Sequence, residues 1–315
     1  MDSDAEPEPV RDDTYRAGHE VDLRRTLQPL FLGAGDPTFR WAPDGFWHAF
    51  RSPDGPATIR VRRGDGADGN AFRIRTWGPG AEWALASVPD LLGARDDWTG
   101  LDLSGHPRLA ELRHRIPGLR LVRTGRVFSA LVPSVLGQKT TGRQARDSFR
   151  SLIRTYGTVA PGPVPEGLLV EPTPAEWGGI PSWGWHRAGV EPARSRTIVT
   201  AAAQADAIDR LARFETGDPR IAAALLSLRG VGGWTAAETV QRSHGDPDAV
   251  SVGDYHLSHD IGWALIGRPV DDDGMLELLE PWRGHRQRIV RLIEASGVRQ
   301  PRRGARLSIQ DHRGH

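Results

Sequence analysis

One short stretch constrains the fold of this chain more than any other. The segment 228–238 reads LRGVGGWTAAE, and helical patterns flank it, DPRIAAALLSL before it and TAAETVQRSHG within and after it. Three glycines in four positions let the backbone turn with positive φ and let another backbone approach closely. The pattern therefore predicts two helices joined by a very short turn, in which the glycines leave the main chain accessible to a partner.

This glycine turn has the helix-hairpin-helix pattern, in which Gly-apolar-Gly joins two helices. The second helix begins with unpaired N–H groups and the positive end of its dipole, which make an anion site, while Val231 anchors the turn in the core. Such a turn can grip a DNA phosphate through main-chain donors without reading bases. The alternative is a plain helical turn with glycine as a C-cap. The residues predicted to contact DNA are Gly230, Val231, Gly232, Gly233 and Thr235.

Composition alone does not decide whether nucleic acid is a partner. The chain of 315 residues has a formal net charge of +1, which is not typical of a protein that coats phosphates. A hairpin that binds through main-chain N–H groups needs little net charge, however. The absence of cysteine excludes disulfides, thiol catalysis, Cys-ligated zinc and iron–sulfur clusters. Lys139 is the only lysine, so Schiff-base chemistry has one candidate side chain.

A second feature follows the hairpin in AVSVGDYHLSHDIGWALIG, where Gly253, Asp254 and Tyr255 open a helical segment. Asp254 stands in the capping position, and a plain structural cap is one interpretation. The other is functional, because Asp254 lies 22 positions after Gly232, on the next helix, where it can face whatever the hairpin holds. A carboxylate at a helix N-terminus also stays ionised, as a group opposing developing positive charge must.

The two ends of the chain differ in charge. Residues 1–18 are acidic and contain proline, unlike a secretory signal, and are predicted to be a disordered tail. Residues 299–315 are predicted to be a basic, flexible tail. Because no apolar run approaches twenty residues either, a cytoplasmic location is expected.

Between the tails the hydrophobic pattern changes once. Residues 19–100 are predicted to form an α+β domain, since TIRVRR and AFRIRTWG alternate apolar and polar residues around a glycine-rich connection. Residues 101–298 are predicted to be helical, with periodicity typical of several helices. Within them, 157–192 has an irregular Pro/Gly/Trp pattern, and 193–213 has the pattern of one long helix.

Taken together, the hairpin, the spacing and the aspartate resemble the helix-hairpin-helix DNA glycosylase superfamily, in its DNA-3-methyladenine glycosylase II branch. The resemblance implies an α+β fold with an N-terminal antiparallel β-sheet domain and helices, followed by a two-lobed all-α body with the cleft between its lobes. It implies a monomer that acts on double-stranded DNA containing damaged bases and is associated with the nucleoid. No cofactor is required on this interpretation.

The resemblance also assigns chemistry to the hairpin and the aspartate. It implies that Asp254 stabilises the oxocarbenium-like sugar and activates water. Where strand-cleaving members have a Schiff-base lysine, this chain has Trp234, so it looks monofunctional. The aromatic face suits a flipped cationic base through stacking and cation–π attraction, although packing between helices is the structural alternative. The implied base-pocket residues are Trp234, Tyr255, Glu238 and Trp185, the last with core packing as its alternative.

Two further sites follow from the resemblance. Gln138, Lys139 and Thr140 lie in the loop whose residue fills the gap left by a flipped base, although a charged lysine intercalates poorly. A structural Na⁺ or K⁺ is implied at the main-chain carbonyls of Leu226, Leu228 and Val231. Two other functions stay open: a glycosylase for a deaminated or oxidised base, and a non-catalytic binder of DNA structure, which has no need of Asp254.

Overall fold

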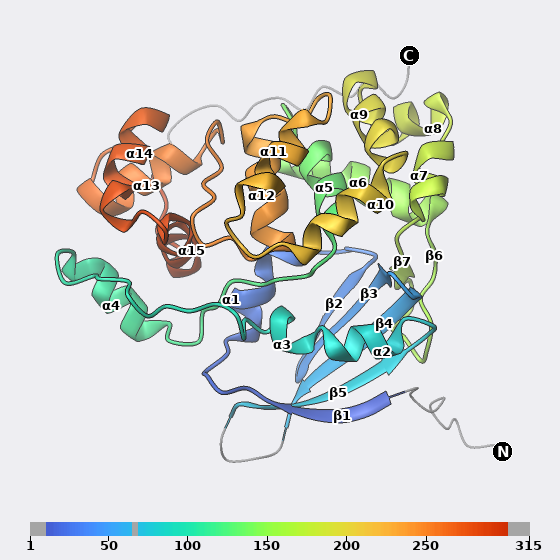
Figure 1. The fold of residues 1–315 in the computed structure, drawn as a ribbon, viewed down its shortest axis with the longest axis horizontal. Helices are drawn as coiled ribbons and strands as arrows, with labels where there is room; N and C mark the ends of the chain where they lie inside the picture. The colour runs from blue at the N-terminus through green and yellow to red at the C-terminus, as the bar shows by residue number, and fades with distance from the viewer. Residues whose placement is uncertain (1–10, 65–68, 302–315) are drawn as a thin grey trace.

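A five-stranded antiparallel sheet carries the N-terminal part of the molecule (Figure 1). The structure is a computed structural model that describes residues 11–64 and 69–301. The strand order is β1-β5-β4-β3-β2, and the strands are β1 (Arg11–Arg16), β2 (Phe39–Ala42), β3 (Gly45–Ser52), β4 (Gly55–Arg63) and β5 (Ala71–Trp77). The predicted hairpin is confirmed, because β4 pairs antiparallel with β5.

Alternation along the strands divides the sheet into two faces. On the inner face Ile59, Val61 and Ile74 are buried in one core, which short helices complete. These helices are α1 (Leu23–Leu27), η1 (Gln28–Leu30), α2 (Ala81–Ala86) and α3 (Val88–Leu91). On the outer face Trp47 and Trp77 stack with their centroids 5.4 Å apart, beneath a small hairpin of β6 (Thr158–Val159) and β7 (Leu169–Val170). The helical part of the chain thus covers some of the sheet.

The predicted disordered tail over 1–18 is wrong where the structure describes it. Residues 11–16 form β1, an edge strand paired with β5. Asp12, which had contributed to the acidic pattern, accepts hydrogen bonds from Arg73 at 2.8 Å and Arg75 at 3.0 Å. Acidic residues here complement arginines that are distant in sequence. Residues 1–10 lie outside the described residues, as do 302–315 of the predicted basic tail, whose first residues Arg299 and Gln300 contact Asp260.

The remaining chain is mostly helical and packs around two hydrophobic cores. The first core lies around α5 (Val127–Leu136) and the second around α15 (Arg286–Ser296). Helices of the first are α6 (Gly142–Tyr156), α7 (Pro174–Gly179), α8 (Ser182–Arg187), α9 (Pro192–Ala202), α10 (Ala205–Asp209), η2 (Arg210–Arg213), α11 (Pro219–Ser227) and α12 (Gly233–Ser243). Those of the second are α4 (Pro107–Arg115), α13 (Leu257–Ile266), α14 (Asp272–Leu279) and η3 (Glu280–Trp282). The α+β class is confirmed.

Two local expectations in this region need correction. The single helix predicted over 193–213 is divided into α9, α10 and η2, because the chain leaves the helical path at Ala203 and Gln204. The irregular segment 157–192 contains two short helices, of which α7 begins with a capping box between Thr173 and Glu176. No helix in the described ranges is both long and apolar enough to cross a bilayer.

A buried charge joins the sheet to the first helical core. Arg126, at the start of α5, donates from Nη2 to Nε2 of His48 on β3 at 2.9 Å. Its guanidinium also lies 4.1 Å from the ring centroid of Phe50 and 3.8 Å from Glu171. The imidazole donates through Nδ1 to the Thr38 carbonyl at 3.1 Å, which leaves Nε2 as the acceptor. Burial, and then the Arg126 charge, lower the pKa of His48 to about 3.

His48 predicts how stability depends on pH. Its folded pKa of about 3 lies below the ordinary 6.5, so between these values the unfolded chain binds a proton that the folded chain excludes. The resulting stability is complete above about pH 6.5 and is lost as pH falls, by about 2 kcal/mol at pH 5. Urea unfolding at pH 7.5 and pH 5 should show a smaller loss in His48→Gln than in wild type. The control is His114→Gln, an exposed position; an equal loss in His48→Gln and wild type would contradict this account.

Candidate functional site

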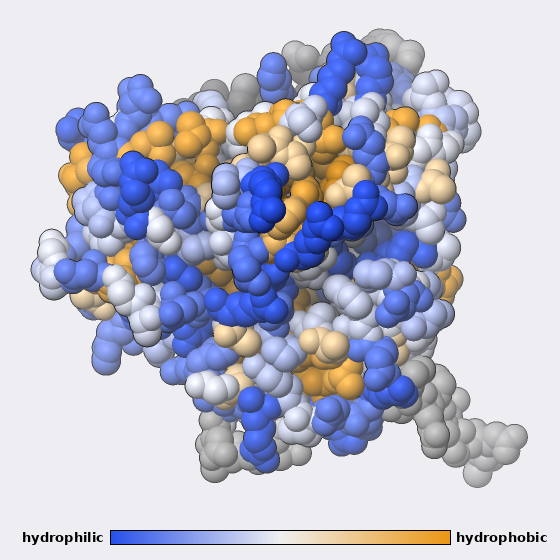
Figure 2. Space-filling model, viewed as in Figure 1, coloured by the Kyte–Doolittle hydropathy of each residue, from blue (hydrophilic) through white to orange (hydrophobic). Residues whose placement is uncertain are grey.

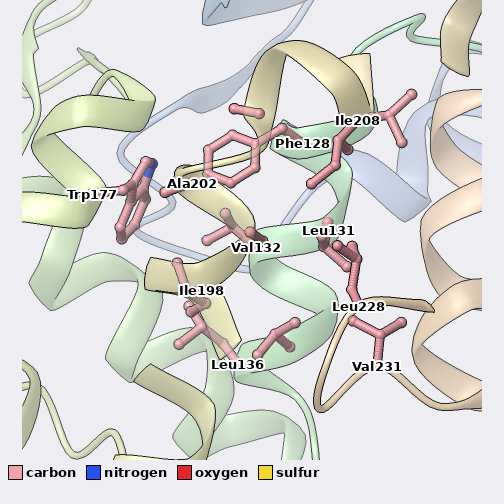
Figure 3. Packing of buried hydrophobic residues seen from close by; sticks show 14 of the residues in the cluster. Phe128, Leu131, Val132, Leu136, Trp177, Ile198, Ala202, Ile208, Leu228 and Val231 are labelled. Atoms are coloured by element: carbon pink, nitrogen blue, oxygen red, sulfur yellow. The ribbon is translucent and has the colours of Figure 1, made fainter. Parts of the chain in front are cut away.

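The predicted hairpin is present, and apolar side chains hold it in the core. Helix α11 begins with the Asp218 side chain accepting from the Arg220 N–H at 2.9 Å and ends at Ser227. In the turn that follows, the Val231 N–H donates to the Leu228 carbonyl at 3.0 Å. Leu228 and Val231 are both buried and lie on the side of the turn that faces α5 (Figure 3). The interpretation of Val231 as the anchor of the turn is confirmed.

The three glycines of the turn serve two purposes. Gly230 has φ +91°, and a Cβ there would lie 2.1 Å from Oγ1 of Thr197 on α9, so this glycine permits close packing inside the protein. Gly232 and Gly233 are exposed, and a Cβ on either would meet nothing within 4 Å. Within the described chain, the N–H groups of Gly232, Gly233 and Trp234 have no acceptor. They form the open, positive end of α12.

This difference between glycines predicts a difference in stability. Gly230→Ala should lower the free energy of unfolding by about 1–3 kcal/mol, because it places a side chain at positive φ and against Thr197. Gly232→Ala is the matched control, since φ is −106° there; its cost should stay below about 1 kcal/mol. Denaturant unfolding measures the free energy of unfolding of both variants. Equal losses would show that the Thr197 side chain moves aside at no cost and would contradict the prediction.

The loop between α5 and α6 is tied to the hairpin by Gln138. Its Nε2 donates to the Gly230 carbonyl and to Oγ1 of Thr235, both at 2.8 Å. Thr235 is buried, so its side chain supports the turn instead of facing solvent. Lys139 is exposed at the tip with φ +49°, and no other non-glycine residue in the described ranges has a positive φ. Thr140 donates to the Gln144 side chain at 3.2 Å, beside the cap of α6.

Asp254 lies in the loop that leads from α12, in the first helical core, to α13, in the second. Its Oδ1 accepts from the N–H groups of His256 at 2.9 Å and Leu257 at 3.0 Å. Helix α13 begins at Leu257 with His256 as its N-cap, so Asp254 lies two residues before the predicted capping position and binds the first N–H of the helix from the preceding turn. The carboxylate is only partly buried, and its Oδ2 has no hydrogen-bond donor among the described residues. One oxygen is therefore fixed by the helix and the other is available to a ligand.

The loop before Asp254 is held by side chains of the hairpin helix. Glu238 on α12 pairs with Arg242 at 2.8 Å and accepts a hydrogen bond from the Ser251 hydroxyl. Gln241 donates to the same hydroxyl and to the Ala249 carbonyl, both at 2.9 Å. Glu238, which the resemblance implied as a base-pocket residue, thus has an arginine and a serine as its partners. Ser251 and Gln241 were missed by the sequence reasoning, although the spacing of Glu238 and Gln241 places them on neighbouring positions of one helix face.

The predicted base-pocket aromatics lie in three different environments. Trp234 is partly buried, with its ring against Gly137, where a Cβ would lie 3.0 Å from the indole. Tyr255 is 73% exposed and meets the His256 ring edge-on at 4.8 Å. The prediction of Trp185 as a base-pocket residue is wrong. Trp185 is buried in the first core, and its Nε1 donates to the Ile180 carbonyl at 3.1 Å, so it cannot line a pocket beside Asp254.

Two exposed apolar side chains lie close in sequence to the hairpin and to the aspartate. Leu226 is 49% exposed at the end of α11, and Val252 is exposed two residues before Asp254. Figure 2 shows apolar surface among polar side chains over the upper helical part of the molecule. The predicted cation at the carbonyls of Leu226, Leu228 and Val231 stays a prediction; the Leu228 carbonyl already accepts one N–H.

Comparison with known proteins identifies the fold. No family model and no curated protein matches the sequence. Among solved structures, 3-methyladenine DNA glycosylase from Archaeoglobus fulgidus superposes with a TM-score of 0.69 at 16% identity, covering 89% of this chain and 97% of that one. The 8-oxoguanine glycosylase/lyase of Clostridium acetobutylicum, solved with double-stranded DNA, has a TM-score of 0.65 at 13% identity, covering 94% and 99%. The chain therefore has the fold of the helix-hairpin-helix DNA glycosylases.

Proposed function

We propose that this protein is a monofunctional DNA glycosylase that hydrolyses the N-glycosidic bond of alkylated purines, of the 3-methyladenine type, flipped from duplex DNA. The observation that carries the proposal is Asp254, which keeps one free carboxylate oxygen in a loop joined directly to the hairpin helix. A protein that only bound DNA would need the hairpin but not this carboxylate. The two similar structures, one of them bound to DNA, support the same class.

The hairpin would hold DNA without reading it. The exposed N–H groups at Gly232 and Gly233 and the positive end of α12 can bind a backbone phosphate. Lys139, exposed at the neighbouring loop tip, is placed to enter or flank the gap left by a flipped base, because Gln138 is already bonded to the hairpin. Between the two helical cores, which we take as the two lobes, the damaged base would approach Asp254.

The chemistry follows from one carboxylate and one aromatic ring. As the glycosidic bond breaks, positive charge develops on the sugar, and Oδ2 of Asp254 can stabilise it and orient water for attack. An N-alkylated purine is already cationic and leaves readily, so no general acid is needed. The face of Trp234 can bind such a base through cation–π attraction. With tryptophan in place of a lysine after the hairpin, hydrolysis without strand cleavage is expected.

A second candidate is a glycosylase for another lesion, such as an oxidised purine. The similarity in fold to the clostridial 8-oxoguanine enzyme favours it. For either lesion class we expect a monomer in the cytoplasm, associated with the nucleoid. A bound Na⁺ or K⁺ at the carbonyls of Leu226, Leu228 and Val231 would have only a structural role.

The test is a lesion panel. Duplexes containing 3-methyladenine, 7-methylguanine, hypoxanthine, uracil or 8-oxoguanine are incubated with the protein, and abasic sites are revealed by alkaline cleavage. Release of the alkylated purines is the expected result, with no strand cleavage before alkali. Release of only a deaminated or oxidised base supports the second candidate. Binding to duplex DNA with release of no base would leave a non-catalytic binder and overturn the proposal.

A further inference from the structure

The turn that carries Asp254 is bonded to the hairpin helix through the side chain of Ser251. Ser251 is 4% exposed, and its carbonyl accepts the N–H of Asp254 at 3.2 Å. Gly253, between them, has φ +90° and donates its N–H to Asp272 at 3.0 Å. Whatever moves Ser251 therefore moves the backbone on which the Asp254 carboxylate stands.

Two residues of α12 hold this serine in one orientation. A hydroxyl has one proton to donate, and here Ser251 donates it to Glu238 while accepting from Nε2 of Gln241 at 2.9 Å. The second proton of the Gln241 amide goes to the Ala249 carbonyl at 2.9 Å. Glu238 is itself held by Arg242 at 2.8 Å, and Arg242 donates from Nε to the Pro29 carbonyl at 3.0 Å. The hydroxyl proton of Ser251 and both amide protons of Gln241 therefore each have an acceptor, which fixes the orientation of the serine.

The position of Glu238 connects the start of α12 closely to the loop that carries Asp254. Glu238 lies in the middle of α12, one helical turn after Trp234 and Thr235, which stand at the end where the hairpin N–H groups are exposed. The carboxylate is 19% exposed and is engaged on both sides, by Ser251 and by Arg242. Both of its partners are protein side chains, so Glu238 holds the loop through Ser251 and is not a solvated surface carboxylate.

We propose that Glu238 and Ser251 are positioning residues for Asp254: through their hydrogen bond, the helix whose N-terminus faces the DNA phosphate sets the place of the catalytic carboxylate. This inference rests on the proposed function and goes beyond it by naming residues that do not touch the substrate. Reaction rates are sensitive to such placement, and a shift of about 1 Å can cost about 100-fold.

The experiment measures single-turnover base release by Ser251→Ala, Glu238→Ala and Glu238→Gln on the preferred alkylated duplex. In Ser251→Ala and Glu238→Ala the rate constant should fall about 10–100-fold, while the reaction amplitude and the Kd for an abasic-site duplex stay within about twofold. Glu238→Gln keeps an acceptor oxygen for the Ser251 hydroxyl, so it should retain most of the rate. The double variant Ser251→Ala/Glu238→Ala should be no slower than the slower single variant, because both act through one linkage.

The matched control is Ser134→Ala, which removes another buried serine hydroxyl, one that donates to the Ala130 carbonyl of its own helix at 2.8 Å; it should react like wild type. A loss confined to amplitude or thermal stability would show a purely structural role and overturn the inference. So would a Ser251→Ala rate equal to wild type, or multiplicative single and double effects. A defect in Glu238→Ala alone would instead make Glu238 a substrate contact. Absence of base release by the wild type defeats the proposed function, not this linkage.

Discussion

Replacing Asp254 by asparagine is expected to abolish base release while leaving the fold intact. The two side chains have the same shape, and the amide oxygen can still accept the N–H groups of His256 and Leu257, so the start of α13 is preserved. What is lost is the negative charge opposite the developing sugar cation. Removal of such a group lowers rates by about 100- to 10,000-fold. Single-turnover release on a 3-methyladenine duplex measures the loss.

A second aspartate gives a matched control for this prediction. Asp271 is the N-cap of α14, and its side chain accepts from the Gly274 N–H at 2.9 Å, as Asp254 accepts from N–H groups at the start of α13. Asp271→Asn should therefore share any effect of a weakened cap but not the effect on chemistry. If both variants lose activity equally, the role of Asp254 is structural. If Asp254→Asn releases base as fast as wild type, the carboxylate is not part of the mechanism.

The features that could be predicted from sequence are those set by local backbone chemistry. Glycines at 230, 232 and 233 indicated a tight turn between two helices, and Asp254 was expected to bind main-chain N–H groups at the start of the next helix. The β4–β5 hairpin was predictable because alternation and a glycine-rich connection occur within a few residues of each other. In each case the partners are neighbours in sequence, so tertiary packing had little chance to override the pattern.

The features that could not be predicted depend on partners distant in sequence. β1 appeared as an acidic tail because Arg73 and Arg75, which pair with Asp12, lie about sixty residues away. The sequence could not distinguish a core position from a pocket position for Trp185, because its burial depends on the tertiary packing of the first core. The division of 193–213 into α9, α10 and η2 has no proline or glycine signal at Ala203 and Gln204. The role of Ser251 could not be predicted either, because its hydrogen bonds to Glu238 and Gln241 form only when the loop packs on α12.

Loss of Arg126 is expected to have the largest effect on stability. Its side chain is 11% exposed and that of its partner Glu171 is 12% exposed, so the ion pair has little access to water, while the hydrogen bond to His48 joins Arg126 to the sheet. Removing one member of a buried ion pair leaves the other charge uncompensated, which costs about 3–5 kcal/mol. Arg126→Met retains much of the apolar stem against Phe50 but removes the charge and the hydrogen bond to His48. Its free energy of unfolding in urea at pH 7.5 should be lower than that of wild type by this amount.

The control for Arg126→Met is an arginine whose ion pair is exposed to solvent. Arg143 pairs with Asp147 at 3.8 Å with 73% of its side chain exposed, and Arg143→Met should change the free energy of unfolding by less than about 0.5 kcal/mol. Adding Glu171→Gln to Arg126→Met should recover part of the loss, since the uncompensated carboxylate is then neutral. No recovery in the double variant would place the cost in the lost contacts to His48 and Phe50. A loss in Arg126→Met no larger than in Arg143→Met would mean that the sheet and the helical part do not depend on this buried charge.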